Sequence, residues 1–135
     1  MNKTKKPNLP NLDELLVLIN LDKTMRSEGF VWETPQQIVQ AAQDELEEVR
    51  EALDHNHSHE HLEEELGDLF HTLVSLVLHT HSDFERIFAF HNKKIIMRYN
   101  LLKKIAQERG FSTLHKLPHK TLIDLWKTAK CQSSL

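Results

Sequence analysis

Hydrophobic residues recur along most of the chain with the three- and four-residue spacing of amphipathic helices. No segment shows the strict alternation of apolar and polar residues that a half-buried strand would need. The spacing predicts five helices: about Leu12–Met25, Pro35 to about Asp54, about Glu60–Thr80, Asp83 to about Arg109, and a short one from Pro118 to about Lys130. We therefore expect an all-α fold of four main helices and a short fifth, packed as a bundle.

Local signals mark the ends of two of these helices. Thr34-Pro35-Gln36-Gln37 is typical of a capping box, with Thr34 as the cap, Pro35 at the first helical position and Gln37 bonding back to the cap. Gly110 follows the fourth helix where glycine commonly ends a helix, and Phe111 can supply the accompanying hydrophobic contact.

The third predicted helix is apolar around most of its circumference, which is typical of a buried helix at the centre of a fold. Its apolar residues are Leu62, Leu66, Leu69, Phe70, Leu73, Val74, Leu76, Val77 and Leu78. A bundle of 135 residues can hardly cover such a helix alone. We therefore expect the protein to form a homo-oligomer.

The composition narrows the fold class and the setting. Three glycines and four prolines are about half the usual share, which excludes turn-rich sandwiches and small barrels. The single cysteine, Cys131, favours a reducing, cytoplasmic compartment. We expect no membrane-spanning segment and no signal peptide, because no apolar run is long enough to span a membrane and the first apolar stretch has no small-residue cleavage site. We expect one domain over residues 1–135, with flexible tails at 1–11 and 131–135.

The formal net charge of −3 argues against a general nucleic-acid binder, and we expect neither a nucleic acid nor a membrane as partner. The distribution of charge is more informative. Eleven carboxylates and one basic residue, Arg50, lie between Asp44 and Asp68, whereas basic residues dominate from Lys93 to Lys130. An acidic half and a basic half suit a site that holds metal cations together with an anionic ligand.

Two pairs of carboxylates stand out because helical spacing turns them toward the apolar side. Glu65 and Asp68 share one face of the third helix, with Glu65 beside leucines, and Glu45 and Glu48 form a matching pair in the second helix. If the two helices form an antiparallel hairpin, the four carboxylates converge on a site for a hard cation such as Mg²⁺. The remaining acids are expected on solvated surfaces: Asp44, Glu47, Glu51, Glu63 and Glu64.

Gly67 lies between Glu65 and Asp68, although a glycine inside a helix costs about 1 kcal/mol relative to alanine. Two interpretations stay open. Either a ligand or another backbone approaches closely there, or two helices pack tightly with no ligand between them.

These residues resemble a known family. Glu45-x-x-Glu48 followed by Glu65-Leu66-Gly67-Asp68 is similar to the ExxE and ExxD signature of MazG-type all-α nucleoside triphosphate pyrophosphohydrolases. Further similar segments are Trp32 before the Thr34 box, Asn92-Lys93-Lys94-Ile95-Ile96-Met97-Arg98-Tyr99, and Leu125-Trp126-Lys127-Thr128-Ala129-Lys130.

The resemblance implies a Mg²⁺-dependent enzyme, with Mn²⁺ as a possible substitute, that cleaves nucleoside triphosphates between the α- and β-phosphates and cleans the nucleotide pool. It also implies a homodimer or homotetramer. Glu45, Glu48, Glu65 and Asp68 would be metal ligands and catalytic residues, with Glu45 or Glu48 as general base. The implied substrate contacts are Lys94, Arg98, Trp126, Lys130, Asn92 and His61.

The chain departs from the family pattern at three places. His61 stands where a lysine is common, Met97 replaces the first of two arginines, and Phe30-Val31-Trp32-Glu33 replaces a Cys-Pro-Trp-Asp stretch. A helical interaction module without turnover is therefore an alternative function. A di-iron protein using Asp68 and His71 is a more distant one.

His55, His57, His59 and His61 alternate between the second and third predicted helices. The favoured interpretation is a mobile, solvated loop without fixed geometry. Binding of Zn²⁺ or Ni²⁺ is the alternative.

Overall fold

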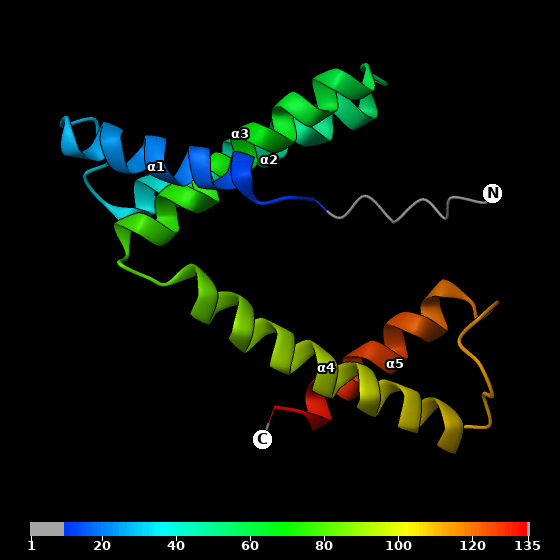
Figure 1. The fold of residues 1–135 in the computed structure, drawn as a ribbon. Coiled ribbons are helices and arrows are strands. Elements are labelled where there is room, and N and C mark those ends of the chain that lie inside the picture. Colours follow the sequence, from blue (N-terminus) through cyan, green and yellow to red (C-terminus); the bar gives the residue numbers. More distant parts are fainter. Residues whose placement is uncertain (1–9, 135) are drawn as a thin grey trace, which may run out of the picture. The chain divides into compact units, whose positions relative to one another are not determined.

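The structure is a computed structural model that describes residues 10–134. These residues form five α-helices and no strand: α1 (Asp13–Ser27), α2 (Pro35–Asp54), α3 (His59–His79), α4 (Phe84–Glu108) and α5 (His119–Gln132) (Figure 1). The all-α prediction is confirmed. α5 runs two residues past its predicted end, so Cys131 is helical. Most of the predicted N-terminal tail, residues 1–9, lies outside the described residues.

The helices belong to two compact units, one containing α1–α3 and the other α4 and α5. In the first unit, α2 and α3 form an antiparallel hairpin along their length, and α1 packs against α3 (Figure 1). Ile38, Val49 and Ala52 of α2 and Val74 of α3 are buried there. In the second unit, α5 packs across α4.

Hydrogen bonds at the helix ends explain the short connections. The capping box at Thr34 is present, with both reciprocal bonds formed between Thr34 and Gln37. Two residues after the last residue of each of α1–α4 comes a residue with positive φ, and the residue after it donates its N–H to a carbonyl five residues back, as Phe111 does to Ala106 at 2.9 Å. The positive-φ residues at these four helix ends are Gly29, Asn56, His81 and Gly110. Asparagine and histidine thus serve where glycine is more usual, which suits a chain with few glycines.

The apolar surface of α3 is only partly covered within its unit. Val74 is buried, but Leu66, Phe70 and Leu73 are exposed. Within its unit α3 contacts α1 and α2, but only Val74 and Ser75 of this helix are buried, so the prediction of a helix buried nearly all round is not met there. The apolar stripe that motivated the prediction of self-association stays uncovered within the unit.

The second unit has its own small core. Leu102, Ile105 and Ala106 of α4 pack with Leu125 and Ala129 of α5, and Phe111 lies against them as its position after Gly110 predicted. An ion pair of 2.8 Å between Arg109 and Asp124 also joins the two helices.

None of the five helices combines the length and the hydropathy that crossing a membrane would require.

Candidate metal centre

Three carboxylates from two helices meet on the α2–α3 hairpin. One oxygen each from Glu45, Glu65 and Asp68 lies within 4.8 Å of the others, and no other such group of histidine, cysteine or acidic side chains occurs among residues 10–134. The arrangement follows from the sequence: Glu65 and Asp68 are three residues apart on α3, and the antiparallel packing of α2 places Glu45 opposite them. Glu65 is partly buried, with 14% of its side chain exposed.

The cluster is electrostatically unfavourable without a cation. Partial burial, reinforced by the neighbouring charges of Asp68, Glu65, Glu48 and Asp44, raises the pKa of Glu45. An oxygen-only donor set that gathers negative charge in this way fits a hard divalent cation such as Mg²⁺.

The structure unites three of the four predicted ligands. Glu48 is exposed and lies outside the group that spans 4.8 Å, yet its charge is close enough to contribute to the raised pKa of Glu45. Its role as a ligand stays a prediction. His61 lies beside the cluster, with Nε2 at 3.5 Å from Oε1 of Glu65.

Gly67 is not explained by packing within the chain. A Cβ placed at Gly67 would meet no atom of the described residues within 4 Å. Tight packing against α1 or α2, the other helices of its own unit, is therefore excluded, and the interpretation that needs a ligand or a second chain stays open.

A cavity of about 270 Å³ lies on the same side of α3, one turn beyond Asp68. It is enclosed by α1, α3 and the α1–α2 connection, and its lining combines apolar and polar groups: Asp22, Met25, Arg26, Phe30, Val31, Trp32, His71, Thr72 and Ser75. A concave, mainly apolar pocket with a few polar groups is the usual form of a small-molecule site.

A buried polar network forms one wall of this cavity. Asp22 of α1 accepts hydrogen bonds from the Ser75 hydroxyl at 2.5 Å and from Nε of Arg26 at 2.7 Å, and its Oδ2 lies 3.1 Å from Nε2 of His71. Burial raises the pKa of Asp22, but the bonds from Ser75, Arg26 and His71 and the charge of Arg26 outweigh burial and lower its pKa below the ordinary value. Arg26 also donates to the carbonyl of Ser75 at 2.6 Å.

Sequence reasoning missed this cavity and its network. The signal for the network was Asp22, which occupies a helical position where the apolar stripe of α1 continues. His71 contacts Asp22 of α1 through Nε2, so in the di-iron alternative Nδ1 is the ring nitrogen that would bind iron.

The predicted phosphate and nucleotide contacts belong to the second unit. Lys94 and Arg98 are one turn apart on α4, and Nε of Arg98 donates to the Ser133 hydroxyl at 3.2 Å. Ser133 in turn bonds to the carbonyl of Lys130 at 3.1 Å, so Arg98 and Lys130 lie close together. Asn92 is exposed on α4. Trp126 is partly buried against the core of its unit, so at least part of its role is packing.

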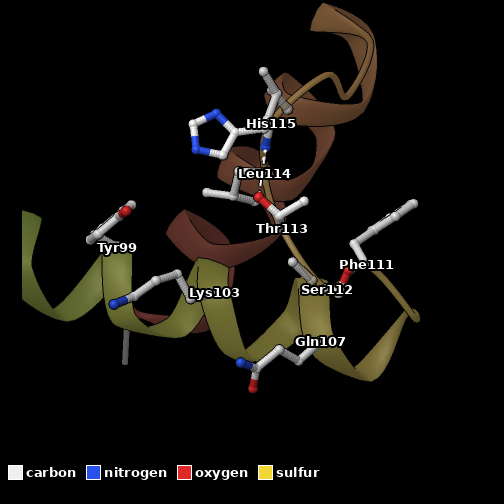
Figure 2. Close-up of a pocket in the computed structure, with 10 residues that line it drawn as sticks. Tyr99, Lys103, Gln107, Phe111, Ser112, Thr113, Leu114 and His115 are labelled. Carbon is white, nitrogen blue, oxygen red and sulfur yellow. Dashed lines mark hydrogen bonds between the residues drawn. The ribbon is translucent and has the colours of Figure 1, made fainter.

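A larger cavity of about 540 Å³ lies between the second half of α4, the α4–α5 connection and α5 (Figure 2). Tyr99, Lys103 and His115 face it, with Nζ of Lys103 at 4.8 Å from the centre of the Tyr99 ring. None of the predicted site residues lines this cavity. The volume of a cavity therefore does not identify the site of the predicted residues. We place the candidate site at the carboxylates of α2 and α3.

The chain is similar to known proteins both as a match to a family and as a match to a single relative. Residues 33–102 match the MazG nucleotide pyrophosphohydrolase domain. The nucleoside triphosphate pyrophosphohydrolase/pyrophosphatase MazG of Thermotoga maritima is 30% identical over 102 residues, which cover 76% of this chain and 38% of that protein. The chain thus spans little more than a third of the length of that relative. The match to the domain includes both carboxylate pairs, and the chain belongs to the MazG nucleotide pyrophosphohydrolase family.

Proposed function

We propose that the protein is a Mg²⁺-dependent nucleotide pyrophosphohydrolase that converts nucleoside or deoxynucleoside triphosphates to monophosphates and pyrophosphate, in the manner of a house-cleaning enzyme. The observation that carries the proposal is the convergence of Glu45, Glu65 and Asp68 within 4.8 Å. Carboxylates alone would repel a triphosphate. Metal cations held by these carboxylates would attract it, so the site suits a substrate with several negative charges.

We assign the residues as follows. Glu45, Glu65 and Asp68 would hold Mg²⁺ or Mn²⁺, which when bound would neutralise phosphate charge and favour ionisation of the attacking water. Glu48 lies near the cluster but outside the triad, so we assign it as the general base that accepts the proton of this water. Water breaks the anhydride bond between the α- and β-phosphates, and pyrophosphate leaves.

The cavity next to Asp68 is our candidate for the nucleoside. His71 and Thr72 extend the face of α3 that carries Asp68, so a substrate whose phosphates lie at the carboxylates can place its base against Trp32 and Met25. Stacking on an aromatic ring accepts any base, because every base has a π-face. The polar wall around Asp22 and Arg26 then supplies fixed hydrogen-bonding groups.

For the second unit, we propose that Lys94 and Arg98 contact the triphosphate and that Trp126, Lys130 and Asn92 contact the nucleotide. Lys94 and Arg98 share one helix face and can engage one phosphate chain, with the guanidinium suited to two parallel hydrogen bonds. The bond of Arg98 to Ser133 uses only Nε and so holds the side chain in place.

We also propose self-association through the apolar face of the hairpin. Val39, Leu46 and Leu53 recur at seven-residue spacing on α2, and Leu66, Phe70 and Leu73 lie on the corresponding side of α3; all six are exposed. In an antiparallel pair these two stripes fall on the same face of the hairpin. A patch of this kind commonly marks a protein interface, and a second copy of this chain is the occupant we propose, as a dimer or a tetramer.

The proposal is tested by incubating the full chain with a panel of nucleoside and deoxynucleoside triphosphates and Mg²⁺, and measuring pyrophosphate. We expect release from at least one nucleotide, and its loss on chelation with EDTA. Release from none of them would support the non-catalytic module instead. Visible absorbance after loading with iron would support the di-iron alternative.

A further inference from the structure

The turn between α2 and α3 is more ordered than the alternating histidines predicted. Only residues 55–58 lie outside the helices, because α3 begins at His59. The backbone N–H of His57 donates to the carbonyl of Ala52 at 3.0 Å, and the Ser58 hydroxyl accepts from the N–H of His61 at 3.2 Å. Both ends of the turn are thus held by hydrogen bonds, and His59 and His61 belong to α3 rather than to a loop.

This turn brings two imidazoles together. The ring centres of His57 and His61 are 4.7 Å apart, with the rings packed edge to face. On the other side of His61, Nε2 lies 3.5 Å from Oε1 of Glu65. His59 is separate from this group, because its Nε2 pairs with Glu63 at 2.9 Å.

We propose that His57, His61 and Glu65 form a second metal site, which binds a transition-metal ion of the Zn²⁺ class. Two imidazole nitrogens and one carboxylate oxygen are a ligand set typical of zinc, whereas Mg²⁺ prefers oxygen alone. A solvent molecule would complete the tetrahedral set.

The ligand atoms of His57, His61 and Glu65 do not all lie within 4.8 Å of one another, so the side chains have to turn to coordinate an ion. Zinc bonds of about 2.0–2.1 Å place two imidazole nitrogens about 3.3 Å apart in a tetrahedral site. The ring centres are 4.7 Å apart, and the exposure of His57 leaves its ring room to turn toward this spacing.

The site has a regulatory consequence that rests on the proposed function. Glu65 belongs to both groups, so an ion held by the two histidines competes for the same carboxylate as the ion at Glu45 and Asp68. Zinc bound at His57 and His61 should therefore antagonise Mg²⁺-dependent turnover.

Binding is measured on the metal-free full chain, without nucleotide, by Zn²⁺ competition against a chromophoric chelator. We expect His57→Asn and His61→Asn each to weaken Zn²⁺ binding by about tenfold or more, because each removes one of few ligands. His59→Asn is the matched control, from the same segment but paired with Glu63, and should retain wild-type affinity. Unchanged affinity in His57→Asn, or an equal loss in His59→Asn, overturns the proposal. So does a loss in Asp68→Asn alone, which would place zinc among the carboxylates.

Inhibition gives a second readout that separates the two proposals. His57→Asn should keep Mg²⁺-dependent turnover and need about tenfold more Zn²⁺ for the same inhibition. Inhibition that is unchanged in His57→Asn contradicts a site at the histidines. If the wild-type chain shows no turnover with any nucleotide, the proposed function fails, while the binding measurement still decides the zinc site.

Discussion

The buried carboxylate of Asp22 in α1 accepts a hydrogen bond from the hydroxyl of Ser75 in α3, with 2.5 Å between the oxygens. This bond joins two helices that are far apart in the sequence, and it lies in the wall of the cavity beside the carboxylate cluster. The Asp22 network therefore has a structural role that can be measured apart from turnover.

Asp22→Asn should destabilise the protein at pH 7 by about 1–3 kcal/mol, because an amide nitrogen cannot accept the bonds that now converge on the carboxylate. The folded protein lowers the pKa of Asp22. Its contribution to stability is therefore complete above the ordinary aspartate value of about 3.9 and is lost as the pH falls through the lower folded value. Urea unfolding at pH 7 and below pH 4 measures the free energy of unfolding, and so both the destabilisation by Asp22→Asn and the loss of the Asp22 contribution at low pH. The exposed change Asp54→Asn is the control. An equal loss of unfolding free energy in Asp22→Asn and Asp54→Asn at pH 7 would contradict this structural role of Asp22.

Glu45→Gln should stabilise the protein in the absence of metal, in contrast to Asp22→Asn. Burial and the neighbouring carboxylates raise the pKa of Glu45, so the group stabilises the fold while protonated at low pH, and this contribution is lost as the pH rises through the raised folded value. At neutral pH the neutral variant should therefore melt at a higher temperature than the wild type in EDTA. Mg²⁺ should raise the melting temperature of the wild type and have little effect on the variant. Glu51→Gln, an exposed change on the same helix, should behave like the wild type; a variant that melts lower in EDTA would refute the electrostatic argument.

Leu46→Glu should shift the protein to a smaller assembly, because it places a charge in the apolar face of the hairpin. Leu21→Glu in α1 is a closely matched control, since Leu46 is 51% and Leu21 52% exposed. Light scattering coupled to size exclusion gives the mass of each. A wild-type protein that is monomeric would refute self-association, and dissociation by Leu21→Glu alone would place the interface on α1.

Trp32→Ala should weaken substrate binding by about 1–3 kcal/mol if its ring stacks on the base. The loss should appear mainly in KM, because stacking on the base is similar in the ground state and the transition state. Steady-state kinetics with the best substrate of the panel tests this. Unchanged KM would remove the cavity from the nucleotide site.

The sequence was sufficient for the features that depend on local spacing. The capping box of Thr34 and Gln37 formed as predicted, and the three-residue spacing of Glu65 and Asp68 placed both in the carboxylate cluster with Glu45. Helical periodicity is regular enough for such predictions, and an antiparallel hairpin is the natural arrangement of two consecutive helices joined by a short turn.

Features that depend on contacts between distant residues could not be predicted in this way. The pairing of Asp22 with Ser75 needs the packing of α1 on α3, which periodicity does not specify. The order of the histidine turn depends on Asn56 adopting a positive φ of 52°, an unusual choice for a residue other than glycine. Neither the Asp22–Ser75 pairing nor the conformation of Asn56 can be predicted before the packing of the helices is known.

The most direct test of the carboxylate cluster is the product analysis of Asp68→Asn beside the wild type, with Mg²⁺ and the preferred triphosphate. Phosphorus NMR of the reaction should show nucleoside monophosphate and pyrophosphate in equal amounts for the wild type. For the variant it should show turnover reduced by at least about a hundredfold, since a metal ligand is lost, while circular dichroism shows an unchanged helical fold. Wild-type turnover in Asp68→Asn, or nucleoside diphosphate and inorganic phosphate as the wild-type products, would contradict the proposed function.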